Sequence, residues 1–227
     1  MIDNLKLGIK IMKYGHSAKL SFVAAIVLMV FGLVFSLVSM SVKFSFPGGY
    51  FIMMAVLLLL QVISTVNASH LVQTSPVKKK LQTSVPAVVS ITLMLAGYLL
   101  NLVTVGVVSL CSSKAVSAVG PACNQLIYTA VIMGIVMLYY GACFKRFIAS
   151  TIAFMVMFFI TYRPMISGKM YWNLMPFANP LGNFALTALI GLGIILICGL
   201  LQYLLSLALY KDPMSKLALG ANLRRQL

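Results

Sequence analysis

The chain has 227 residues, of which 62% are hydrophobic and 8% are charged. A soluble domain carries about a quarter charged residues, so this composition excludes a soluble globular protein and indicates an integral membrane protein. Basic residues also far outnumber acidic ones: the chain has 17 Lys and Arg residues but only two acids, Asp3 and Asp212, and no Glu.

Residues 2–15 predict an amphipathic helix that lies in the membrane interface. One face carries apolar residues at helical spacing: Ile2, Leu5, Ile9 and Met12. A second stripe is basic: Lys6, Lys10 and Lys13. A basic amphipathic helix of this kind lies in the plane of the membrane rather than across it. The alternative is a frayed, solvated N-terminus.

Six apolar segments follow, each long enough or nearly long enough to cross a membrane. They are residues 20–41, 50–68, 85–110, 125–144, 147–162 and 184–210. A helix needs about 20 residues to cross the roughly 30 Å hydrocarbon layer, and the fifth segment is short by that measure. The link before it, Lys145-Arg146, is too tight unless both helix ends unwind into the turn.

The loop at residues 69–84 carries the most specific pattern. Residues 73–86 read QTSPVKKKLQTSVP. Ser75 can cap a short helix whose first residue is Pro76, and that helix would stop before Pro86. It would carry three consecutive cations: Lys78, Lys79 and Lys80. Two interpretations stay open, a docking segment for a partner and three lysines that mark one side of the membrane.

Cys111 and Cys123 flank the loop after the third segment. On the external side a disulfide between them could persist, although the sequence does not reveal whether the compartment oxidises it. Cys143 and Cys198 fall in or at the ends of apolar segments and are predicted to be packing residues.

Basic residues orient the predicted bundle. Most of them lie before residue 20, in the loop 69–84, in the link after residue 144 and in the tail after residue 210. Cytoplasmic loops carry the excess of Lys and Arg, so both termini are predicted in the cytoplasm. The same cations meet anionic lipids. Nucleic-acid binding is not expected, because no loop is large enough to form a basic reading surface.

The shortage of acids excludes several classes of function. Proton-coupled pumps hold a titrating carboxyl group inside the bundle, and glycosidases need a pair of carboxylates. Zinc peptidases of the HExxH type need a Glu base. An ATPase needs a phosphate-binding loop and an acid on its metal ion, and the motif GxxxxGK[ST] is absent from the sequence. We therefore expect no catalytic residue, cofactor or metal site in this chain.

The order of these features resembles the permease subunit of an ABC-2-type exporter. In such permeases the loop between the second and third crossings bears a coupling helix that docks on a separate ATPase, and residues 73–86 look like that loop. The resemblance is to small bacterial permeases that export bacteriocins or amphipathic peptide toxins. It implies that one segment couples to the ATPase: Thr74, Ser75, Pro76, Val77, Lys78, Lys79, Lys80 and Leu81.

The resemblance implies an all-α integral membrane protein of the bacterial cytoplasmic membrane, with six transmembrane helices and one permease domain over residues 1–227. ATP and Mg²⁺ would bind to the partner ATPase, and a second permease copy or paralogue would complete the assembly. The cargo would be a hydrophobic or amphipathic peptide, because the predicted spans carry few polar groups. Residues 163–183, with Trp172, would form an external loop of short re-entrant helices or of aromatic anchors.

Two other classes of function remain as alternatives. Substrate-binding subunits of energy-coupling-factor vitamin importers are also small, six-spanning and basic, although they present a polar external pocket. A membrane immunity protein without transport activity is the other alternative.

Overall fold

The apolar runs of the sequence form helices. The computed structural model describes residues 2–13, 18–38, 47–67, 69–111, 115–166 and 180–216. Within these ranges the chain is helical apart from short turns, and it contains no strand. The helices are α1 (Ile2–Lys13), α2 (Ala18–Val38), α3 (Pro47–Asn67), α4 (His70–Thr74), α5 (Lys78–Gln82), α6 (Ser84–Cys111), α7 (Ala115–Ala142), α8 (Phe147–Ile166), α9 (Pro180–Ala208) and the 3₁₀ turn η1 (Leu209–Lys211).

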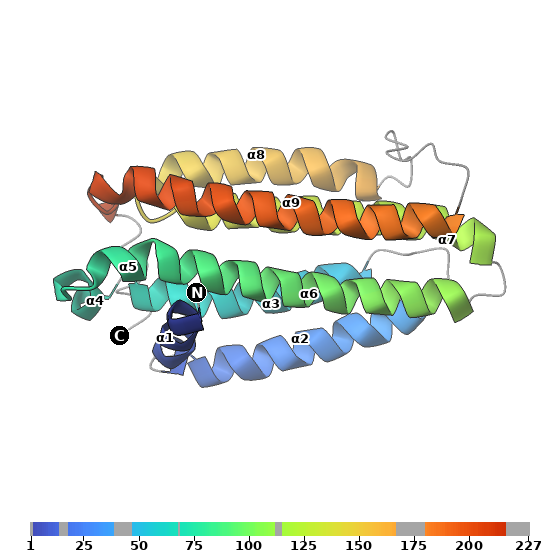
Figure 1. Ribbon diagram of the computed structural model, residues 1–227, viewed down its shortest axis with the longest axis horizontal. Coiled ribbons are helices and arrows are strands. Elements are labelled where there is room, and N and C mark those ends of the chain that lie inside the picture. Colours follow the sequence, from blue (N-terminus) through green and yellow to red (C-terminus); the bar gives the residue numbers. More distant parts are fainter. Residues whose placement is uncertain are drawn as a thin grey trace.

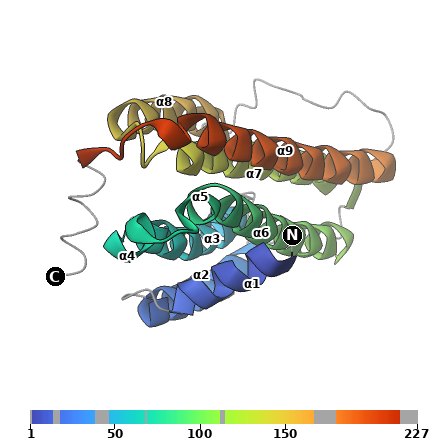
Figure 2. The ribbon, with the colours of Figure 1, turned by 60° about the vertical axis from the view of Figure 1, so that its left-hand side comes forward.

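The long helices lie side by side and alternate in direction along the chain (Figure 1). As a result α4, α5, the α7–α8 turn and the end of α9 gather at one end of the bundle. Helix α1 lies crosswise to the long helices, since Figure 1 looks almost along its axis and Figure 2 shows its length. This crosswise position is the one that the amphipathic pattern of residues 2–15 predicts.

The exposed surface of the long helices is apolar. Leu20 on α2 is 75% exposed, Phe159 on α8 is 65% exposed and Leu189 on α9 is 66% exposed. Exposure of many large apolar side chains is unfavourable in water, whereas hydrocarbon solvates them. The fold is therefore that of a membrane-embedded protein.

Four helical stretches in the described part of the chain are long and apolar enough to cross a membrane: Ala18–Phe35, Gly48–Asn67, Lys78–Val107 and Phe184–Lys211. Helices α7 and α8 contain shorter apolar stretches, Leu126–Ala142 and Phe147–Thr161. The all-helical class is confirmed, whereas six crossings and the side on which the termini lie stay predictions.

The observed helix boundaries differ most from the predicted ones at α7. This helix begins at Ala115 and includes Pro121, which the sequence places in a loop before residue 125. Proline removes one helical hydrogen bond, a loss that membrane helices tolerate. At its other end α7 stops at Ala142, and α8 starts at Phe147. Both helix ends thus unwind into the turn, as the tight Lys145-Arg146 link predicts.

The predicted external loop 163–183 overlaps two helices of the structure, and its residues 167–179, where short re-entrant helices are predicted, lie outside the described residues. Helix α8 continues to Ile166 and α9 begins at Pro180. Both helices therefore extend into the predicted loop, and Trp172 lies outside the described residues.

Helix α6 lies at the centre of the bundle and packs on α3, α7 and α9, while the closest pairs of helices are α7 with α9 and α2 with α3. Glycine permits one of these close approaches. A Cβ atom on Gly134 of α7 would lie 2.7 Å from the Sγ atom of Cys198 on α9, which is inside van der Waals contact. The packing role predicted for Cys198 agrees with this position. Small residues at helix contacts are the usual means of close packing in membranes.

Candidate functional site

The loop predicted to couple to a partner folds as two short helices, α4 and α5, joined by a turn. Ser75 does not cap a helix that begins at Pro76, because α5 begins at Lys78 with Val77 as its cap residue. Ser75 instead ends α4, and its side-chain Oγ accepts a hydrogen bond from the backbone N–H of Val77 at 3.3 Å. The predicted cap is therefore wrong by two residues, because Ser75 satisfies the turn rather than a helix start.

The end of this loop also differs from the prediction. Helix α5 ends at Gln82 and α6 starts at Ser84, so Pro86 lies in the first turn of α6 rather than after a stop. A proline is tolerated there because the first N–H groups of a helix have no intrahelical partner.

The loop exposes a mixed basic and apolar surface. Five of its residues are exposed, with Ser75 and Lys78 half-buried beside them: Thr74, Pro76, Val77, Lys79 and Lys80. Leu81 points the other way, being 6% exposed within the core cluster. Leu81 thus anchors α5 on the bundle while the turn and two lysines face outward.

The Gln73 side chain ties this loop to the segment that follows α9. The Nε2 group of Gln73 donates to the backbone oxygen of Asn67 at 3.1 Å and lies 3.1 Å from the Sδ atom of Met214. The first contact fixes α4 to the end of α3. The second joins α4 to the segment that follows α9, which is 141 residues away in sequence.

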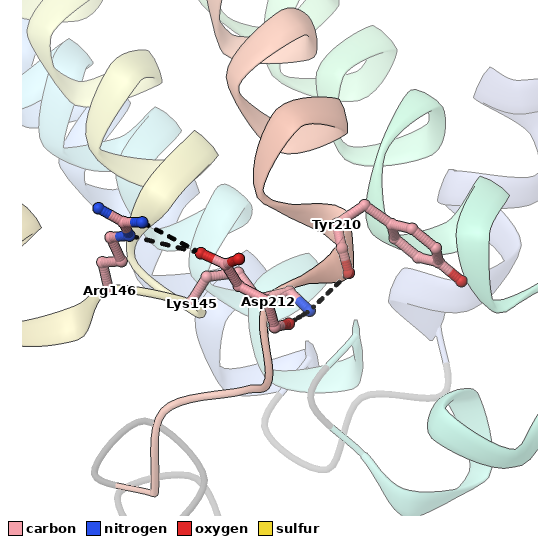
Figure 3. A network of polar contacts seen from close by, with 4 residues as sticks. All are labelled: Lys145, Arg146, Tyr210 and Asp212. Atoms are coloured by element: carbon pink, nitrogen blue, oxygen red, sulfur yellow. Dashed lines mark hydrogen bonds and ion pairs between the residues drawn. The ribbon is translucent and has the colours of Figure 1, made fainter.

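The same segment is fastened to the α7–α8 turn (Figure 3). The Lys145 Nζ group donates to the backbone oxygens of Asp212 at 2.6 Å and of Tyr210 at 3.2 Å. Arg146 forms an ion pair with the Asp212 carboxylate at 3.4 Å. The backbone N–H of Ser215 donates to the oxygen of Phe144 at 3.0 Å. We refer to residues 209–216 as the strap.

The strap and the loop form one basic end of the bundle. Burial lowers the pKa of the Lys145 ammonium group, the nearby Lys78 lowers this pKa further, and Asp212 raises it. The effect of Lys78 indicates that α5 lies close enough to the α7–α8 turn for their charges to interact. Figure 1 places α5, the α7–α8 turn and the strap at the same end of the bundle. We define the basic end as α4, α5, residues 143–146 and the strap.

The predicted amphipathic helix is present as α1, with its lysines exposed, whereas its position in the membrane interface stays a prediction. Lys6, Lys10 and Lys13 are exposed. The residues of its apolar face differ in their surroundings. Leu5 and Met12 pack on the core, whereas Ile9 is 48% exposed. The pattern therefore locates the helix, but part of its apolar stripe contacts α3 and α6 and part faces outward.

An apolar groove of about 460 Å³ lies between α2 and α3 on one side and α7 and α8 on the other. Aromatic rings line both walls. Phe51 stacks on Phe35 with ring centroids 5.3 Å apart, and Tyr139 lies 4.9 Å from Phe154. Gln61 adds an amide to this lining, beside the hydroxyl groups of Tyr50, Tyr139 and Tyr140. A groove with this lining suits an apolar chain or an amphipathic peptide.

The structure gives no sign of a metal centre or a disulfide in the part that it describes. No group of three His, Cys, Asp or Glu residues comes together there. Cys123 is a buried free thiol, and the side chain of Cys111 lies outside the described residues, so the bridge between Cys111 and Cys123 stays a prediction. Cys143 is also a buried free thiol.

Comparison of the chain with protein-family models, with curated proteins and with solved structures gives no match. The function must therefore be argued from the residues and the geometry alone.

Sequence reasoning did not find the strap, although one signal for it was present. Asp212 follows the last apolar segment, on the same predicted side as Lys145 and Arg146. A single acid on the same side of the membrane as two cations predicts an ion pair, provided that the end of the last apolar segment is known to lie beside the Lys145-Arg146 link. The groove left no comparable signal, because its lining residues come from four different helices.

Proposed function

We propose that this chain is the membrane permease subunit of an ABC-2-type exporter and that α4 and α5 dock on a separate ATPase. The observation that supports the proposal is the loop itself. A short basic segment is exposed at one end of an apolar bundle and is fixed to that bundle by Leu81 and Gln73. A segment of this kind can receive a push from a partner and pass it to α3 and α6.

The surface of the loop defines the partner's chemistry. Lys79 and Lys80 call for acidic side chains, and the exposed Val77 and Pro76 call for a shallow apolar pocket beside them. The proposed partner is an ATPase that binds ATP and Mg²⁺. A second copy or a paralogue of the permease would complete the transporter in the bacterial cytoplasmic membrane.

The test is co-expression with ABC ATPases of the same genome, followed by copurification and an assay of ATP hydrolysis in lipid vesicles. The triple variant Lys78→Glu, Lys79→Glu, Lys80→Glu should lose the bound ATPase and the stimulated hydrolysis. Lys19→Glu is the matched control, because Lys19 is also exposed but lies on α2, outside the loop. Recovery of the unaltered protein without any ATPase, or equal hydrolysis in the triple variant, would contradict the proposal.

The groove supports a hydrophobic or amphipathic peptide as the cargo. Its walls are aromatic and aliphatic, and it lies among the apolar helices rather than at their polar ends. Replacing Met54, which lines the groove, by Trp should fill part of the space. We expect Met54→Trp to reduce the stimulation of hydrolysis by an amphipathic helical peptide and to leave the basal hydrolysis unchanged. Equal stimulation would exclude the groove as the cargo path.

A further inference from the structure

Another, much smaller cavity, which is partly open, lies between helices at the basic end. Its volume is about 20 Å³. Its walls come from α3, α6, α7 and α9, with Phe144 from the α7–α8 turn. Four of its lining side chains are polar and at least nine-tenths buried: Ser64, Asn67, Ser90 and Gln202. A polar cluster of this kind is unusual in a bundle whose other surfaces are apolar.

Two of these polar groups are paired across helices. Ser90 Oγ on α6 donates to Gln202 Oε1 on α9 at 2.5 Å. Ser64 Oγ donates within its own helix to the Gln61 backbone oxygen at 2.8 Å. Both hydroxyl oxygens keep lone pairs that can accept a further hydrogen bond.

Asn67 is different. Its side chain is 3% exposed, and its Oδ1 atom accepts no hydrogen bond from the part of the chain that the structure describes. An unpaired acceptor buried in an apolar bundle lowers the stability of the fold, because it has lost its hydrogen bonds to water. A small hydrogen-bond donor would satisfy this atom, and Asn67 is one of the residues that line the cavity.

We propose that this cavity is a binding site for one internal water molecule. About 10–15 Å³ is enough to hold a water, provided that two to four polar groups surround it, and the cavity meets both conditions. The water donates one hydrogen bond to Asn67 Oδ1. Its second hydrogen and its lone pairs are within the reach of the Ser64, Ser90 and Gln202 groups that line the same space.

The position of this water matters for the movement of the helices. The backbone oxygen of Asn67 holds Gln73 of the loop, and its side chain contacts the water site. Gln202 belongs to the last turns of α9, which the strap fastens to the α7–α8 turn. The water thus joins the helices that meet at the basic end, because one water can bridge polar groups on several helices.

The test is water-edited solid-state NMR on the full-length, isotope-labelled protein in lipid bilayers, which needs no partner protein. Polarisation should pass from water to the Asn67 side-chain amide several-fold faster than to the methyl group of Met94, which is fully buried in the core. Transfer no faster than at Met94 would overturn the water site, whatever the fate of the proposed ATPase coupling.

A variant tests which residue holds the water. Asn67→Leu removes the acceptor and should abolish the fast transfer at the Gln202 side-chain amide, while Asn67→Asp, which keeps an acceptor, should retain it. Fast transfer at Gln202 in the Leu variant would overturn the role of Asn67. The measurement on the unaltered protein stands even if the Leu variant does not fold.

Discussion

Among single residues, Gly191 on α9 occupies a position with no room for a larger side chain. A Cβ atom at this position would overlap the hydroxyl and the ring of Tyr98 on α6. Tyr98 is itself fully buried, so its rigid ring has no room to move away. Two residues further along the same helix, a Cβ on Gly193 would meet nothing within 4 Å. The two glycines therefore form a matched pair in one helix.

We expect Gly191→Ala to destabilise the bundle by about 1–3 kcal/mol, the usual cost of overpacking a filled core. Gly193→Ala should be neutral or stabilising by about 0.5–1 kcal/mol, because glycine loses more backbone freedom than alanine when the chain becomes helical. Reversible unfolding in mixed detergent micelles, followed by circular dichroism, measures both. Equal stability of the two variants would contradict the packing of Tyr98 against Gly191.

Lys145 and Arg146 are neighbours whose contacts differ in kind. Lys145 is half-buried and donates to two backbone oxygens of the strap, just after the end of α9, where a cation also complements the helix dipole. The Arg146 side chain is 66% exposed in its ion pair with Asp212. Hydrogen bonds to charged groups contribute about 1.5–3 kcal/mol, whereas exposed ion pairs contribute about 0–1 kcal/mol.

Lys145→Met should therefore release the strap, and Arg146→Met should not. The measurement is hydrogen exchange of the backbone amides at residues 209–216 in lipid nanodiscs. Exchange should become faster in Lys145→Met and stay close to that of the unaltered protein in Arg146→Met. If the Arg146 variant exchanged faster than the Lys145 variant, the ion pair rather than the backbone contacts would hold the strap.

At the level of the helices, periodicity predicted α1 well because its apolar and basic residues recur at helical spacing. It could not predict how the apolar stripe is shared between protein and surroundings. That division depends on Gly8, which is buried against Val89 of α6, and a glycine leaves no mark in a hydrophobic pattern. The Ser75 cap failed for a related reason, since Ser75 serves a turn as readily as a helix start.

The docking of α1 can be tested at Gly8. A Cβ there would overlap Val89, so Gly8→Leu should lift α1 from α6 at a cost of about 1–3 kcal/mol. The backbone amides of α1 should then exchange faster in nanodiscs. Ile9→Ala is the control, because Ile9 is half-exposed and contributes less to this contact. Unchanged exchange in Gly8→Leu would mean that the membrane, not α6, holds the helix in place.

For the whole molecule, composition and apolar runs predicted an all-helical, membrane-embedded fold, and most helix boundaries fall within a few residues of the predicted ones. The internal features were beyond reach of the sequence. The groove and the water cavity each need residues from four helices, and the strap needs the end of α9 to meet the α7–α8 turn. Such contacts depend on how the helices pack against one another, and this packing cannot be predicted from the apolar runs of the sequence.

The orientation of the whole bundle gives the last prediction. The contact between Gln73 and Met214 places the loop and the strap at one end, and that end carries the lysines of α5 and the α7–α8 turn. Because positive loops stay in the cytoplasm, Thr74→Cys and Lys216→Cys, each in a background without other cysteines, should resist a membrane-impermeant maleimide in intact cells. Both should react once the membrane is opened. Lys114→Cys, between α6 and α7, should react from outside.

Reaction of both basic-end cysteines in intact cells would show that the topology is inverted, and a cytoplasmic ATPase could then not contact the loop. A reaction at only one of the two positions, Thr74 or Lys216, would contradict the fold, because the structure places both at the same end.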